Sequence, residues 1–192
     1  MSSAALRLPT FDELYAEIEA LPEGLTGEIM GPGELRTMSR PGAPHRYFGK
    51  RVARSLDGAD LSVGGSGWWI EVEAEIQLPS ERLYVPDLAG WRASGPPDFI
   101  YDNPITVVPA WVCEILSRAT QRADRVRKLP YYAAAGVEHV WIVDPVARTV
   151  EVYQTVQGHP SLIAAAADGD VATLAPFDLP IDVGALWLAP RG

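Results

Sequence analysis

Residues 111–145 read WVCEILSRATQRADRVRKLPYYAAAGVEHVWIVDP and predict an apolar strand, a basic helix and a second apolar strand. Glu114 interrupts the first strand, where a buried carboxylate is costly unless it is paired or binds a metal. The helix carries Asp124, Lys128 and Tyr132 at positions i, i+4 and i+8, which places all three on one face. An acid in a strand that faces a lysine on the next helix can hold a metal and stabilise charge developing on a substrate. The alternatives are a solvated lysine paired with Asp124, and a core tyrosine.

A second lone acid occurs in LYVPDLAGW, residues 83–91, which predicts another strand with Asp87 as its only charge. Two acids in neighbouring strands near a lysine form an oxygen-rich site of the kind that suits Mg²⁺ or Mn²⁺. Asp87 can also be interpreted as a turn acid after Pro86, and Glu114 as a strand-end carboxylate paired with an arginine.

In their order and spacing, these segments resemble the Uma2 family (DUF820), a branch of the PD-(D/E)xK restriction-endonuclease-like superfamily. The resemblance covers about 12–187, and its matching pieces are VPDLAGWR at 85–92, WVCEILS at 111–117, DRVRKLPYY at 124–132, GVEHVWIVDP at 136–145, TVEVY at 149–153 and PFDLPIDVGALW at 176–187. It implies that Asp87 is the PD aspartate and Glu114 the acid of the (D/E)xK element. Leu116 stands where the superfamily has its lysine, and the resemblance implies that Lys128 takes its place.

Two further acids are candidates for the same site. Glu28, in Gly27-Glu28-Ile29, resembles the family's N-terminal acid, so we expect it to complete the metal site or orient a water. The alternative is an ordinary hairpin charge. Glu75 shares a predicted strand face with other acids in EVEAEI, residues 71–76, and it is our choice for a further metal ligand.

The net charge of −9 argues at first sight against a nucleic-acid partner, but the basic residues are concentrated. Eleven of the 16 lysines and arginines lie in residues 36–54 and 118–128. A local basic surface can bind phosphates on an anionic protein. The alternative is two solvated helix faces, with His45 as a cap or surface residue. The residues from which we expect contacts to nucleic acid are His45, Arg46, Arg118, Arg122 and Arg125.

The length and composition predict one domain over 1–192, with its core at about 10–188; 47% of residues are apolar and 21% charged, as in ordinary globular proteins. The periodicity predicts helices at about 10–20, 44–56 and 120–135, a hairpin around 31–34, strands at about 68–78, 83–92, 105–117, 138–144 and 149–156, and weaker strands near 161–166 and 171–174. This order predicts an α/β (α+β) fold with a central mixed β-sheet flanked by helices. The resemblance implies the same restriction-endonuclease-like core.

Other features bear on the compartment. No apolar run approaches the ~20 residues of a membrane span, and the first residues lack the apolar core of a secretory signal. Cys113 is the only cysteine, which fits a reducing cytoplasm.

The site and the resemblance together predict an endonuclease that hydrolyses phosphodiester bonds with Mg²⁺ or Mn²⁺. DNA is the default substrate by resemblance, and a homodimer would supply two sites for cutting two strands. The alternative is a non-catalytic binding or assembly module that retains the nuclease fold, since fold does not imply function.

Overall fold

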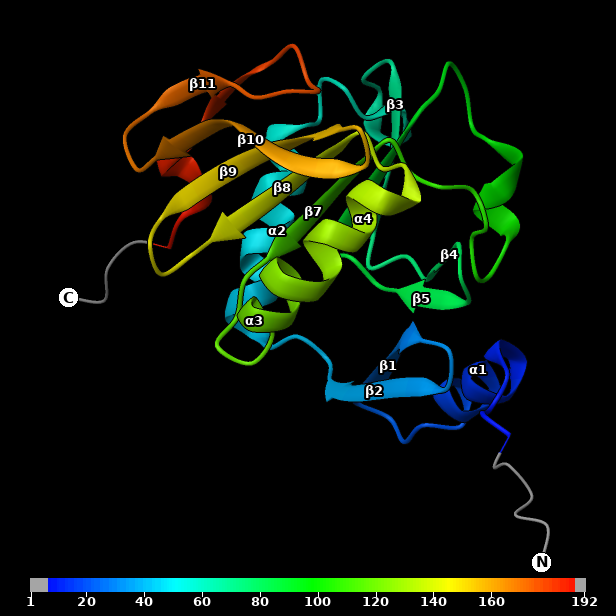
Figure 1. Ribbon diagram of the computed structural model, residues 1–192. Helices are drawn as coiled ribbons and strands as arrows, with labels where there is room; N and C mark the ends of the chain where they lie inside the picture. Colours follow the sequence, from blue (N-terminus) through cyan, green and yellow to red (C-terminus); the bar gives the residue numbers. More distant parts are fainter. Residues whose placement is uncertain (1–6, 189–192) are drawn as a thin grey trace, which may run out of the picture.

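The computed structural model describes residues 7–188, which form two main β-sheets with helices packed against them (Figure 1). The large sheet has six strands in the order β10-β9-β8-β7-β6-β3, and the small sheet has four in the order β2-β1-β5-β4. In the large sheet β7 and β8 are parallel and the other neighbours antiparallel, which confirms the predicted central mixed sheet flanked by helices. A short pair, β11 and β12, lies beside them.

The strands span β1 Leu25–Gly31, β2 Glu34–Ser39, β3 Trp68–Val72, β4 Ile76–Leu78, β5 Arg82–Tyr84, β6 Leu88–Arg92, β7 Trp111–Ile115, β8 His139–Asp144, β9 Thr149–Val156, β10 His159–Ala167, β11 Val171–Thr173 and β12 Pro180–Asp182. The α-helices span α1 Phe11–Glu19, α2 Ala43–Ser55, α3 Gln121–Ala123 and α4 Leu129–Ala135. Short 3₁₀ turns span Leu61–Val63, Asp98–Tyr101 and Gly184–Leu186.

The two faces of the large sheet carry different helices, because alternate residues of a strand point to opposite faces. Trp111, Cys113 and Ile115 of β7 belong to the apolar cluster that includes α2. Val112 belongs to the cluster that includes Leu129 and Tyr132 at the start of α4. Figure 1 shows α2 and α4 on opposite sides of β7. Glu114 therefore lies on the α4 face.

The helical connection between β7 and β8 is not one regular helix. The residues predicted as a helix over 120–135 form α3, a π-helical turn over Asp124–Lys128, and α4. Pro130 removes the donor that an α-helix would offer to the carbonyl of residue 126. In the widened turn before it, Leu129 N–H instead bonds to the carbonyl of Asp124. Such π turns are frequent at functional sites.

Two long predicted strands are each broken, and this corrects the expectation. The predicted strand 68–78 becomes β3 in the large sheet and β4 in the small sheet, with Glu73 at a left-handed φ of +53° between them. The predicted strand 83–92 becomes β5 and β6, separated at 85–87, where Pro86 cannot donate to a strand partner. Because β3 pairs with β6 and β4 with β5, the two broken segments form one long hairpin. Both of its arms pass from the large sheet to the small sheet at the same level.

The segment predicted as a strand over 105–117 is also shorter than expected, since only Trp111–Ile115 is β-strand. Ile105 makes an isolated bridge to Ile76, which belongs to the small sheet. The first helix, the N-terminal hairpin and the strands β8 to β11 lie close to their predicted positions. Within residues 7–188, no helix has the length and apolarity needed to cross a membrane.

Candidate active site at the junction of the two sheets

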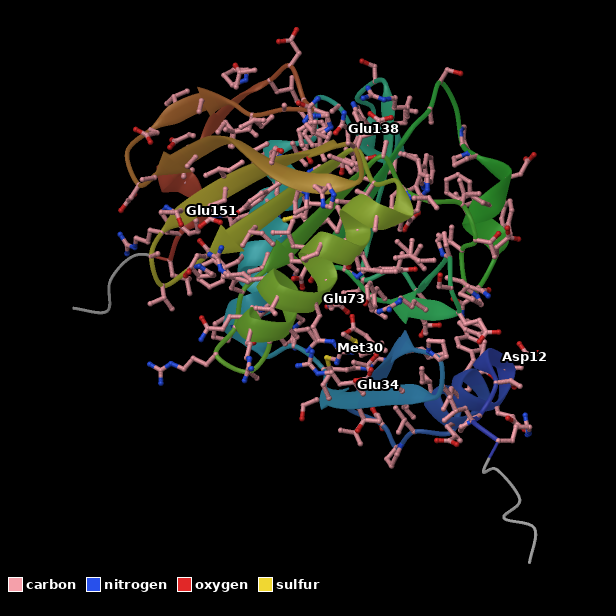
Figure 2. All side chains as sticks on the ribbon, viewed as in Figure 1. Asp12, Met30, Glu34, Glu73, Glu138 and Glu151 are labelled. Atoms are coloured by element: carbon pink, nitrogen blue, oxygen red, sulfur yellow. The ribbon has the colours of Figure 1, made fainter. Side chains whose placement is uncertain are left out.

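A cavity of about 510 Å³ opens where the two sheets meet, and it collects most of the predicted site residues. Its lining includes Glu28, His45, Glu75, Asp87, Glu114 and Lys128. These residues come from β1, α2, the two strand breaks, β7 and the π turn. In Figure 2 the labelled Glu73, which also lines the cavity, lies between the large sheet and the β1–β2 hairpin. The broken strands therefore create the place where these side chains converge.

Lys128 reaches Glu114 as the spacing along the helix led us to expect. The parallel pairing of β7 and β8 requires the connecting helix to run back over the sheet. The Lys128 Nζ atom consequently lies 3.2 Å from Glu114 Oε1, and the Tyr132 hydroxyl donates to the same oxygen at 2.6 Å. Lysine and tyrosine thus sit one turn apart on the face that covers Glu114.

Two more carboxylates surround the same ammonium group. Lys128 Nζ lies 2.6 Å from Glu28 Oε1 and 3.6 Å from Asp124 Oδ1. The side chains of Lys128 and its three acidic partners are each at most 5% exposed. The solvated-lysine alternative is therefore wrong for Lys128: its ammonium is enclosed by three carboxylates.

Burial and charge act on this cluster in opposite directions. Burial would lower the pKa of Lys128, but the three acids outweigh burial and raise the pKa of Lys128 well above its usual value. Burial raises the pKa of Glu114 well above its ordinary range, against the opposing charge of Lys128. Burial likewise raises the pKa of Asp124. Three carboxylates around one ammonium are an excess of negative charge in a buried place, which favours the arrival of another cation.

Asp87 occupies the strand break beside Glu114. Its neighbour Leu88 pairs with Cys113, so Asp87 and Glu114 are next to each other in register across β6 and β7. Asp87 Oδ2 accepts the backbone N–H of Ile115 at 2.6 Å. The break itself is stabilised by Glu28, whose Oε1 atom accepts the N–H of Val85 at 3.1 Å. The two acids that the resemblance singled out therefore share one corner of the cavity.

His45 makes a contact that the sequence did not reveal. Its Nε2 atom lies 2.5 Å from Asp87 Oδ1, and the two side chains are 19% and 13% exposed. Burial lowers the pKa of His45, but its hydrogen bond with Asp87 and the charge of Asp87 outweigh burial, so the net pKa is raised. Only the fold brings the start of α2 to the strand break, so no local signal could have paired residues 42 positions apart.

The remaining predicted residues lie in different surroundings. Glu75 lies at the edge of the cavity, where its Oε2 atom accepts the Tyr15 hydroxyl at 2.7 Å. Arg125 makes a two-point ion pair with Glu151, at 2.6 and 3.0 Å, outside the cavity. The three remaining predicted arginines are exposed: Arg46, Arg118 and Arg122.

The residues present fit a hard divalent cation held by few protein ligands. Glu28 Oε2 and Asp124 Oδ1 are buried without a hydrogen-bond partner among residues 7–188. Over the same residues, no three His, Cys, Asp or Glu side chains converge closely enough to hold an ion alone. Mg²⁺ commonly takes only one or two carboxylates and completes its shell with waters and substrate phosphate. Asp87 and Glu114, which line the same cavity, could supply such a pair.

Comparison with known proteins bears on the family and the fold of this chain. The model of the family described as "Putative restriction endonuclease", Uma2, matches residues 11–183. The crystal structure of "a putative nuclease belonging to DUF820" from Anabaena variabilis ATCC 29413 has a TM-score of 0.68 to this chain. The two sequences are 18% identical, and the match covers 93% of this chain and 97% of that chain. At this identity the match shows a similarity of fold. The comparison with curated proteins gives no match.

The family model spans most of the chain. This protein belongs to the Uma2 family.

Proposed function

We propose that this protein is an endonuclease that hydrolyses phosphodiester bonds in nucleic acid with Mg²⁺ or Mn²⁺. Membership of the Uma2 family supports a nuclease-like function. The observation that carries the proposal is the enclosure of Lys128 by Glu114, Glu28 and Asp124 beside Asp87, in one cavity open to solvent. Acids and a lysine at one accessible point are the groups that metal-assisted phosphoryl transfer requires.

Asp87 and Glu114 would hold the metal, with Glu75 as a further ligand from the cavity edge. A bound divalent ion would lower the pKa of a water and polarise the phosphate. Ile115 N–H and Tyr132 O–H donate to the two acids and hold them in place. Donors that bond to metal-binding carboxylates in this way orient them and tune their basicity.

Lys128 would stabilise the extra negative charge of the transition state. Its ammonium is preorganised, because three carboxylates hold it on the cavity wall before any substrate arrives. Glu28 would orient the attacking water, since its Oε2 atom is an acceptor that no protein donor within residues 7–188 uses. His45 contacts Asp87 and would reach a phosphate only by leaving it.

The exposed cations Arg46, Arg118 and Arg122 would contact the sugar-phosphate backbone outside the cavity, and these contacts fix position without reading sequence. The guanidinium of Arg125 is held by Glu151 and would contribute only if it exchanged that partner. DNA is the substrate we propose, and cutting both strands of a duplex would require two sites, as in a homodimer.

The alternative function is a non-catalytic module, and one observation favours it. Lys128 pairs with three buried carboxylates as in a structural ion-pair network, and such networks also perturb pKa values. In that case the acids would hold the fold together rather than a metal.

Incubation with supercoiled plasmid, single-stranded DNA and RNA decides between the two. We expect cleavage with Mg²⁺ or Mn²⁺, none with EDTA, and none by Glu114→Gln. Glu151→Gln is the matched control, since that acid lies outside the cavity. No cleavage of any substrate by the wild type, with either metal, would contradict the nuclease proposal and leave the non-catalytic module.

A further inference from the structure

The β1–β2 hairpin turns one face toward the acid cluster. Glu28 of β1 pairs directly with Arg36 of β2, and side chains of directly paired residues lie on the same side of a sheet. Because Glu28 reaches Lys128, Arg36 is on the cavity side as well. Arg40 follows four residues later and also lines the cavity. The side of the β1–β2 hairpin that carries Glu28, here called the hairpin wall, therefore also carries Arg36 and is followed by Arg40.

Arg36 has a donor that nothing within residues 7–188 uses. Its Nη2 atom donates to the carbonyl of Ala119 at 3.4 Å, while its Nη1 atom is buried and has no hydrogen-bond partner there. Neither Arg36 nor Arg40 takes part in an ion pair within residues 7–188. A guanidinium offers a rigid fork of N–H donors that matches the oxygens of a phosphate.

Two arginines of the other basic stretch, residues 118–128, differ in this respect. Arg125 is bound to Glu151, and Arg127 makes a two-point pair with Glu34 at 2.6 Å for each contact. These two guanidinium groups already have carboxylate partners, whereas the two on the hairpin wall do not. The available positive charge at the cavity therefore comes from β2 and the residue that follows it.

A second cavity, of about 220 Å³, adjoins the first, and apart from Arg40 its charged lining is acidic: Glu19, Glu23 and Glu75. Both are lined by Thr26, Arg40 and Glu75, so Arg40 stands where the two cavities meet. Along the chain, Arg36 and Arg40 are four residues apart, about 13 Å at ~3.3 Å per strand residue. They are thus placed to contact different phosphates of one strand.

We propose that a single strand of nucleic acid runs across the acid cluster, with its backbone held by Arg40 at the edge of the first cavity and by Arg36 beside Ala119. This inference rests on the nuclease function proposed above, and it adds the path of the strand and the residues that hold it. The two arginines bind the phosphates on either side of the scissile phosphate, which Asp87 and Glu114 approach. Both contacts are to the backbone, so they position the strand without selecting its sequence.

The test compares Arg36→Gln, Arg40→Gln and the double variant with the wild type and with Arg54→Gln. Arg54 is an exposed arginine of α2 in the same basic stretch, residues 36–54, and it lines neither cavity. Affinity for a short fluorescein-labelled single-stranded DNA is measured by anisotropy in EDTA across a salt series. Single-turnover cleavage with Mn²⁺ gives the half-saturating protein concentration and the rate at saturation.

We expect the slope of log affinity against log salt to become shallower by about 0.7 for each arginine removed, as for one lost contact to a single strand. The half-saturating concentration should rise several-fold, with a smaller change in the saturated rate, and Arg54→Gln should match the wild type. If the wild type cleaves DNA and the variants keep its salt slope and half-saturating concentration, the proposed path is wrong and the nuclease function stands. If the wild type neither binds nor cleaves nucleic acid, both proposals fail.

Discussion

Two glutamates lie in one row across the large sheet and face the same helical segment. Glu114 on β7 pairs with Ile142 on β8, which pairs in turn with Glu151 on β9. Each glutamate meets one basic side chain of the π turn: Lys128 contacts Glu114 and Arg125 contacts Glu151. Each also accepts a tyrosine hydroxyl, from Tyr132 at 2.6 Å and from Tyr153 at 2.8 Å.

The two sites nevertheless differ in electrostatic character. Glu114 is buried among other acids, and burial raises its pKa well above the ordinary range. Glu151 on β9 is partly exposed, and its hydrogen bond from Arg125 lowers its pKa. The same three kinds of side chain thus form a partly exposed ion pair in one place and a buried group with three carboxylates in the other. Burial and neighbouring acids, rather than the contacts alone, make Glu114 the candidate metal ligand.

The largest difference should appear in metal binding and cleavage. We expect Glu114→Gln to lose Mn²⁺ affinity by more than about 100-fold, since even outer-shell changes at metal sites cost about 10–100-fold. Cleavage should be lost with it, and the metal-free fold should be as stable or more stable, because clustered carboxylates repel. Glu151→Gln should keep the affinity and the cleavage rate. Calorimetric titration with Mn²⁺ measures this, and equal affinities in the two variants would remove Glu114 from the site.

The next largest difference should lie in the effects of replacing the two basic residues, Lys128 and Arg125, on stability and cleavage. Lys128→Met leaves three buried acids without their cation, so we expect the free energy of unfolding to fall by about 3–5 kcal/mol. Cleavage should fall by about 10²–10³, with Lys128→Arg restoring it only in part. Arg125→Met, at a partly exposed pair, should cost about 1 kcal/mol or less. Denaturant unfolding in EDTA compares the variants, and equal losses would show that the two pairs have the same surroundings.

The tyrosines test the comparison at a finer scale. Tyr132→Phe removes a donor from a buried carboxylate and should cost about 1–3 kcal/mol, as for a buried acceptor left unsatisfied. It should also weaken Mn²⁺ binding, because the hydroxyl orients Glu114. Tyr153→Phe leaves Glu151 with Arg125 and solvent, so we expect a change below about 1 kcal/mol. Unfolding curves and Mn²⁺ titrations of both variants check this; a larger loss in Tyr153→Phe would reverse the assignment.

The smallest expected effect is an opposite dependence of stability on pH. Because the pKa of Glu114 is raised in the folded state, its contribution to stability is present below its unfolded pKa, about 4.3, and is lost as the pH rises through the folded value. Because the pKa of Glu151 is lowered, its contribution is present above the unfolded pKa and is lost as the pH falls through the folded value. The stability of wild type minus each Gln variant, measured in EDTA over pH, should therefore slope in opposite directions. Two slopes of the same sign would contradict the pKa assignments.

Much of this site was predictable because local sequence patterns identify its residues. A lone acid in an apolar strand marks Glu114, and the i, i+4, i+8 spacing places Lys128 and Tyr132 on one helix face. The crossover between parallel strands then brings that face over Glu114. Periodicity also predicts the helices and the central sheet, since both depend on residues close in sequence.

Other parts depend on contacts between distant residues, which periodicity does not contain. The breaks at Glu73 and at 85–87 follow from two sheets sharing one hairpin, while the apolar pattern runs on through them. The contact of His45 with Asp87 exists only because α2 begins beside the second break. Charge counting likewise could not show that Arg125 is already paired, whereas Arg36 lines the cavity with one donor that no group in residues 7–188 accepts.

The most direct test of the proposed metal site is a crystal structure of the protein soaked in Mn²⁺, with anomalous scattering used to place the ion. We predict one ion that contacts the carboxylates of both Asp87 and Glu114 at ~2.0–2.6 Å, with Lys128 Nζ beside the cluster and not bound to the ion. An ion bound elsewhere, or a cavity in which Mn²⁺ contacts neither acid, would contradict the account.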